Sequence, residues 1–208
     1  MHLRINAGIA DVPAGKSGVA RMFETMYLRG GDLGSTDPAA ERAALLKAEE
    51  WLDQRDTELE RGPKANLLTT QEYRLRARMA AQGATIYSTP FVVNRAFELN
   101  HFFDTTVNVQ VESTDLVATV AANRAELWFK LTADWLKRPS FRGFYEDRDA
   151  LQQRVDEQTR NMIAVKLYSA LLPAAFPNHP YLRMVSVPAE IAGLRSRDAE
   201  DFRKKYYT

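Results

Sequence analysis

The chain has 208 residues and 45% of them are hydrophobic, which is enough for the core of one large domain or two small ones. Its 28 basic and 27 acidic residues nearly cancel, so charge gives no reason to expect a nucleic acid or an anionic membrane as partner. The absence of cysteine excludes disulfides, thiolate zinc sites and cysteine nucleophiles. No stretch approaches the roughly 18 consecutive apolar residues of a membrane helix, so we expect no membrane insertion.

The first elements are a strand and a helix. Apolar and polar residues alternate over residues 2–9, which predicts a half-buried strand. After a turn rich in Pro and Gly, apolar residues at helical spacing predict a helix over residues 17–29. The polar residues Arg21, Glu24 and Thr25 lie inside this helix. Their side chains are therefore candidates for a functional site.

A helical hairpin is predicted over about residues 37–82. Asp37 is a suitable N-cap for its first helix, and the Gly-Pro pair at 62–63 ends that helix. Thr69 or Thr70 is expected to cap the second helix. Both helices are highly charged, so we interpret the hairpin as a solvated arm.

Two strands and three further helices are predicted after the hairpin. Alternating valines at 107–111 and alternating apolar residues at 116–120 predict two strands that pair antiparallel. Asn123 is expected to cap the next helix, one long helix is expected over 141–173, and a last helix begins at Ser196. The histidines His2, His101 and His179 are far apart in sequence, and we interpret them as unrelated surface residues.

The segment "GVARMFETM" and four further segments in order along the chain resemble the insulinase/pitrilysin-like inverted-zincin metallopeptidases. In that family a strand leads into a helix with the pattern G-x-A-H-x-x-E-H-M. The four segments are "AGIADVPAGKSG", "NRAELW", "FRGFYEDRD" and "DAEDFRKKYY". The resemblance implies an α+β half-domain of the insulinase/pitrilysin-like (LuxS/metallohydrolase-like) fold, with helices packed on an antiparallel sheet. It also implies a single peptidase-like domain over residues 1–208, truncated at both ends, in which the hairpin at about 37–82 is an insertion.

The same resemblance assigns positions to the family's zinc site. The two histidine ligands of the motif correspond to Arg21 and Thr25, and the downstream ligand corresponds to Arg154. The general base corresponds to Glu24, and an auxiliary acid corresponds to Asp147. Only the base keeps its residue type, while the auxiliary position keeps its charge on a shorter side chain. Active relatives are expected to hold zinc.

These substitutions remove the chemistry that zinc needs. Zinc is bound by imidazole, carboxylate or thiolate, and Arg has no lone pair to offer near neutral pH. We therefore expect no metal cofactor, and interpret Arg21, Thr25 and Arg154 as former ligand positions. One hypothesis is that Arg21 and Arg154 form an ion-paired cluster with Glu24 in place of zinc. The alternative is that both arginines reach solvent and contact nothing.

A peptide is the expected ligand. In the family, an edge strand binds extended substrate by strand addition, and the resemblance places that strand at residues 105–111. Its best candidates for a peptide contact are Thr106, Val107, Asn108 and Val109. The two bulky residues just before this strand stand where the family commonly has glycines, which would hinder access.

The resemblance suggests a non-catalytic peptidase homologue that acts as a structural or substrate-holding partner. Its partner would be an active metallopeptidase chain or a second copy of itself. The alternative is a divergent active metalloendopeptidase that uses other ligands or a partner chain, and a third hypothesis is a decayed product without activity. Many bacterial relatives are periplasmic or exported, but the sequence contains no recognisable signal, so the compartment is left open.

Overall fold

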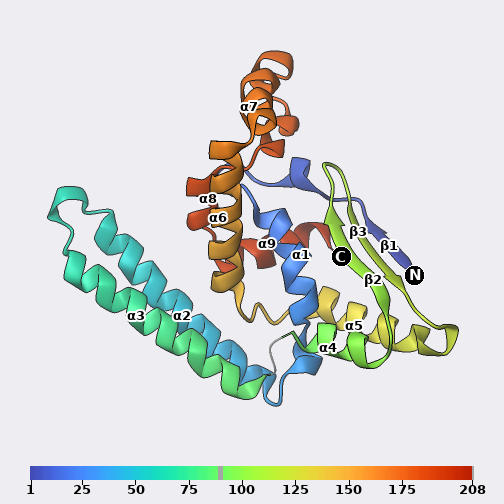
Figure 1. Cartoon of the computed structure of the whole chain (residues 1–208). Helices are drawn as coiled ribbons and strands as arrows, with labels where there is room; N and C mark the ends of the chain where they lie inside the picture. Colours follow the sequence, from blue (N-terminus) through green and yellow to red (C-terminus); the bar gives the residue numbers. More distant parts are fainter. Residues whose placement is uncertain (89–90, 208) are drawn as a thin grey trace.

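A three-stranded antiparallel sheet forms one side of the protein, as the computed structural model shows (Figure 1). The structure describes residues 1–88 and 91–207. The strands are β1 (His2–Ile5), β2 (Phe103–Val109) and β3 (Thr114–Thr119). Their order is β1-β3-β2, and Leu116 of β3 lies opposite Leu3 on one side and Val107 on the other. The predicted α+β class and the antiparallel pair are confirmed, and β2 is an edge strand.

The first strand is shorter than predicted. It ends at Ile5, whereas the alternating pattern continues over residues 2–9. Beyond the strand the chain forms a 3-10 turn (Ile9–Asp11), and the Ile9 N–H donates to the Gln110 carbonyl at 3.0 Å. The chain therefore leaves the ladder to bind the turn between β2 and β3.

The helix predicted over residues 17–29 is present as α1 (Val19–Arg29), and its buried face belongs to the core. It contacts β2 and also α6 (Phe144–Asn161), and Figure 1 shows it between them. Phe23 of α1 is fully buried, with its ring centroid 5.9 Å from that of Trp135 and 4.7 Å from that of Tyr207. These aromatic contacts join α1 to α5 (Ala125–Lys137) and to the residue after α9 (Ser196–Tyr206).

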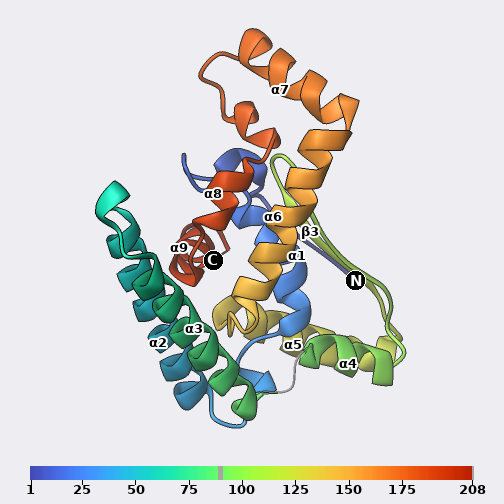
Figure 2. The same cartoon turned by 60° about the vertical axis from the view of Figure 1, so that its left-hand side comes forward.

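The predicted helical hairpin is present as α2 (Pro38–Leu59) and α3 (Leu67–Ala84), which pack on each other and form an arm (Figures 1 and 2). Asp37 caps α2 as expected, because its carboxylate accepts from the Ala40 N–H at 3.0 Å. The predicted cap of the second helix is wrong. Asn66, rather than Thr69 or Thr70, accepts from the first free N–H groups of α3.

The long helix predicted over 141–173 is also wrong, because the chain turns at Met162. That residue has ψ 114°, which is extended, and it separates α6 from α7 (Ile163–Ala175). The turn brings Val165 and Leu172 of α7 to the same cavity as Val155 of α6. Most apolar residues of α7 stay exposed after this turn, and Leu172 is its buried residue.

The remaining elements are short. Asn123 does not cap α5 but lies in a 3-10 turn (Ala122–Arg124) before it, and Arg124 is the N-cap residue. The other short elements are the helices α4 (Val92–Leu99) and α8 (Pro188–Ala192) and the 3-10 segments Asp32–Gly34, Gly62–Lys64, Thr85–Tyr87 and Pro180–Met184. Across the described part of the chain, no helix combines the length and the apolar character needed to span a membrane.

Candidate functional site

The helix α1 presents Arg21, Glu24 and Thr25 on its half-buried side, while its apolar residues face the core. The helix begins after Gly18, whose φ of 88° is a left-handed conformation that favours glycine. A Cβ at Gly18 would lie 2.8 Å from the Ile191 side chain. The start of the helix is therefore fixed closely against α8, and this sets the positions of the polar residues one turn later.

Glu24 binds the backbone of the edge strand. Its Oε1 accepts a hydrogen bond from the Val109 N–H at 3.3 Å. The next residue, Gln110, donates its N–H to the Ser113 carbonyl across the turn, so the Val109 N–H points away from β3. Glu24 therefore occupies a backbone donor that an added strand would use.

The hypothesis of an ion-paired cluster is wrong. Within residues 1–88 and 91–207, the structure has no ion pair between Glu24 and either Arg21 or Arg154. Arg154 lies on the exposed side of α6, whereas Arg21 is half-buried. One oxygen of the Glu24 carboxylate accepts instead from the Val109 N–H.

The donor set at the positions that the resemblance assigns to ligands does not fit a zinc ion. Arg21 and Arg154 carry cationic guanidinium groups without a usable lone pair. The Thr25 hydroxyl donates to the Met22 carbonyl at 3.3 Å, so it is engaged with its own helix. In the described residues no three His, Asp or Glu side chains are grouped so as to hold a metal ion.

Asp147 has a structural partner. Its two carboxylate oxygens accept from Arg29 Nε at 2.6 Å and from Arg29 Nη2 at 2.7 Å, and both side chains are about 12% exposed or less. The guanidinium also lies over the Phe91 ring, 4.4 Å from its centroid. This bidentate pair joins the end of α1 to the first turn of α6.

The predicted peptide-binding residues alternate in exposure along β2. Thr106 and Asn108 are exposed, whereas Val107 and Val109 are half-buried and pack against the core. The backbone of β2 pairs with β3 on one side. No strand pairs with its other side among the described residues, and Glu24 of α1 meets Val109 there.

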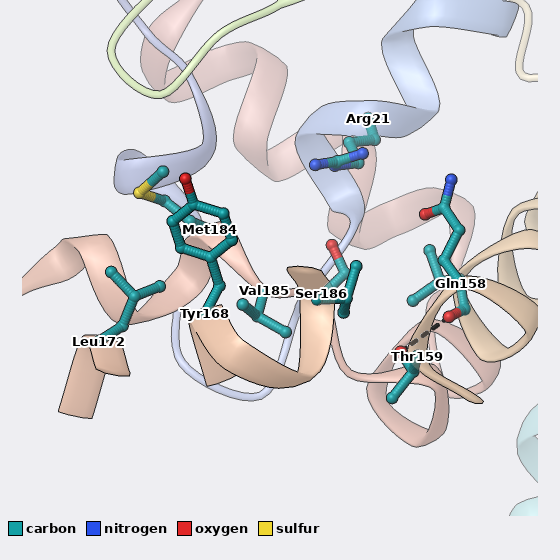
Figure 3. Close-up of a pocket in the computed structure, with 10 residues that line it drawn as sticks. Arg21, Gln158, Thr159, Tyr168, Leu172, Met184, Val185 and Ser186 are labelled. Atoms are coloured by element: carbon teal, nitrogen blue, oxygen red, sulfur yellow. Dashed lines mark hydrogen bonds between the residues drawn. The ribbon is translucent and has the colours of Figure 1, made fainter. Parts of the chain in front are cut away.

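A cavity that sequence analysis did not anticipate lies beside Arg21 (Figure 3). It has a volume of about 150 Å³. Figure 3 shows the Arg21 guanidinium extending over Ser186, with Gln158 on one side of it and Tyr168 on the other. The lining residues are Arg21, Val155, Gln158, Thr159, Val165, Tyr168, Leu172, Met184, Val185 and Ser186. The signal in the sequence was the dense apolar run after residue 162, of which Val165 and Leu172 line this cavity.

Comparison with known proteins finds similarity among solved structures. No protein-family model and no curated protein matches the sequence. Among solved structures, the whole chain superimposes on the periplasmic protease PqqL from Escherichia coli with a TM-score of 0.61 and 13% identity. The first half of the same protease, solved separately, matches with the same TM-score and identity. The chain spans 18% of the full protease and 34% of its first half. The fold of this chain is therefore similar to part of PqqL, in agreement with the predicted α+β half-domain fold.

Proposed function

We propose that this chain is a non-catalytic peptidase homologue that holds peptides or supports an active metallopeptidase. The observation that carries the proposal is the donor set on α1 and α6. Arg21 and Thr25 stand at positions where the resembled family has histidine ligands, and Arg154 stands at the third ligand position. Without a metal-activated water, Glu24 has no nucleophile to generate.

The edge of β2 supports the peptide-holding part of the proposal. An extended peptide adds to an exposed strand through main-chain hydrogen bonds. The Val109 N–H at this edge is already bound by Glu24. Glu24 thus competes with a bound peptide for one backbone hydrogen bond, instead of acting as a general base.

The surface of α7 supports the partner part of the proposal. Ile163, Leu167 and Leu171 are 83%, 63% and 51% exposed. Contiguous exposed apolar groups of this kind are typical of protein–protein contacts. The partner would be an active metallopeptidase chain or a second copy of this chain.

Zinc stoichiometry tests the absence of catalysis. After equilibration with zinc and removal of loosely bound ions, the protein is expected to retain almost none. A variant with Arg21→His, Thr25→His and Arg154→Glu supplies a matched control, since its donor set can hold about one ion per chain. Tight binding by the unaltered protein would overturn the proposal and favour a divergent metalloendopeptidase that uses other ligands.

Peptide affinity tests the role of Glu24. A fluorescent extended peptide with both ends blocked is expected to bind more tightly to the Glu24→Ala variant. The gain should be about 2- to 10-fold, because a typical hydrogen bond contributes about 0.5–1.5 kcal/mol. Arg154→Ala, on an exposed face, is the control. Unchanged affinity in Glu24→Ala would contradict competition at the edge strand.

Light scattering tests the partner surface. If α7 contacts a second copy, the apparent mass should fall to that of one chain when Leu167 is replaced by Lys. Leu68 of α3 is 76% exposed, and Leu68→Lys is the control for a general loss of solubility. A single-chain mass for the unaltered protein would leave an active metallopeptidase as the proposed partner, to be detected by mixing the two proteins. Failure of that mixture to associate would contradict the partner role.

A further inference from the structure

The cavity beside Arg21 combines apolar walls with one charged group. Its apolar lining comes from Val155 of α6, from Val165 and Leu172 of α7 and from two residues before α8. The volume of about 150 Å³ is similar to that of an apolar protein cavity that binds benzene. The space therefore suits a branched aliphatic or phenyl side chain.

Arg21 is the charged residue of this lining, and no carboxylate accompanies it there. Its Nε is buried without a hydrogen-bond partner. In the described part of the chain, the guanidinium forms neither an ion pair nor a hydrogen bond. A half-buried cation without a partner is costly, and an anion in the cavity would remove that cost.

The neutral polar groups beside the guanidinium also suit an anion. Figure 3 shows the Gln158 amide and Ser186 next to Arg21, and both can donate hydrogen bonds. The Thr159 hydroxyl is engaged, because it donates to the Val155 carbonyl at 2.8 Å. A planar carboxylate matches the fork of a guanidinium and would accept from these neighbours as well.

We infer that this cavity binds the C-terminal residue of a peptide, with the α-carboxylate on Arg21 and a medium-sized apolar side chain among the valines. The inference rests on the proposed peptide-holding function and names its substrate class. Arg21 lies one helical turn before Glu24, and Glu24 contacts the edge of β2. A peptide at that edge is therefore close to the cavity. A free aliphatic acid has the same chemistry but would make no use of the edge strand.

A pair of peptides on the unaltered protein provides the first test. Both have the same sequence, a blocked N-terminus and a C-terminal Leu, and one ends in a free acid and the other in an amide. The acid is expected to bind at least about tenfold more tightly, which is typical of a charge-assisted hydrogen bond. Calorimetry measures both constants. Equal affinities would overturn the inference, and no variant has to fold for this comparison.

Variants of the protein and alternative ligands test the same inference. Arg21→Ala should abolish the preference for the acid, whereas the exposed Arg154→Ala should retain it. A C-terminal Trp should bind more weakly than Leu because it exceeds the cavity. Hexanoate that binds as tightly as the acid peptide would overturn the peptide as occupant in favour of a small carboxylate.

The two proposals fail separately. If the peptide blocked at both ends binds but the acid gives no advantage, this inference fails while peptide holding stands. If the acid preference is present but the unaltered protein binds zinc tightly and cleaves peptides, the non-catalytic role fails while the cavity's specificity stands.

Discussion

Arg142 and Glu41 form a buried bidentate ion pair between the helical arm and the rest of the protein. Arg142 Nε and Nη2 donate to the two Glu41 oxygens at 2.9 and 3.1 Å, and the side chains are only 6% and 2% exposed. Arg142 also donates to the carbonyls of Arg29 and Gly31. The pair thus fixes the start of α2 against the end of α1.

Replacing Arg142 by Ala should lower the free energy of unfolding by about 3–5 kcal/mol, because it leaves Glu41 as a buried charge without its partner. Urea denaturation measures the change. Arg160→Ala breaks an exposed pair with Asp156 on α6 and should cost less than about 1 kcal/mol. Equal effects in both variants would contradict the special role of the buried pair.

The double variant Arg142→Met with Glu41→Leu tests whether the charge or the packing matters. Apolar replacement of both partners is expected to recover most of the stability lost in Arg142→Ala, because no charge is then left buried. A double variant as unstable as the single one would show that the backbone contacts of Arg142 dominate.

Gly8 should not tolerate a side chain. A Cβ there would lie 2.4 Å from the Gln110 carbonyl oxygen and 2.6 Å from that of Val111. Because both are backbone atoms, Gly8→Ala is expected to destabilise the protein by about 1–3 kcal/mol, as overpacking does. Thermal unfolding measures the effect.

Gly83 is the matched control for this substitution. It lies in α3 with nothing within 4 Å of an added Cβ. Gly83→Ala should therefore stabilise the protein by about 0.5–1 kcal/mol through helix propensity. A loss of stability at this position would contradict the open space beside Gly83.

Asp115 should make stability depend on acid pH. Hydrogen bonds from Arg4, at 2.7 Å, and then from His2 lower the pKa of its carboxyl from 3.8 to about 2. Because the folded state holds the charged form more strongly, this contribution is present above about pH 4 and is lost as the pH falls towards 2. Between about pH 4 and pH 2, the denaturation midpoint of Asp115→Asn should fall less steeply with decreasing pH than that of the unaltered protein. An unchanged slope would contradict the prediction.

Tyr27 should make stability depend on alkaline pH. Burial raises the pKa of its phenol from 10 to about 12, and its hydroxyl lies 3.0 Å from that of Thr132. The folded state favours the neutral form, so this contribution is present below pH 10 and is lost as the pH rises to about 12. Tyr27→Phe should reduce the loss over this range. Ultraviolet titration of the two proteins checks the assignment, because the difference between them reports Tyr27.

Local patterns in the sequence were sufficient to predict several secondary-structure elements. The alternation around Val107 and Leu116 predicted two paired strands, and the spacing of apolar residues predicted α1 and the face that it buries. Asp37 was identified as an N-cap because the capping residue and the helix that it caps are adjacent in sequence. These features depend on residues a few positions apart.

The tertiary structure decided what lies opposite those faces. The end of β1 at Ile5, the turn at Met162 and the partner of Glu24 all depend on residues far along the chain. Likewise, the cavity beside Arg21 forms only where α1, α6, α7 and residues 184–186 meet. A periodic pattern specifies which side of an element is buried, whereas hydrogen-bond partners and cavities follow from how distant elements pack.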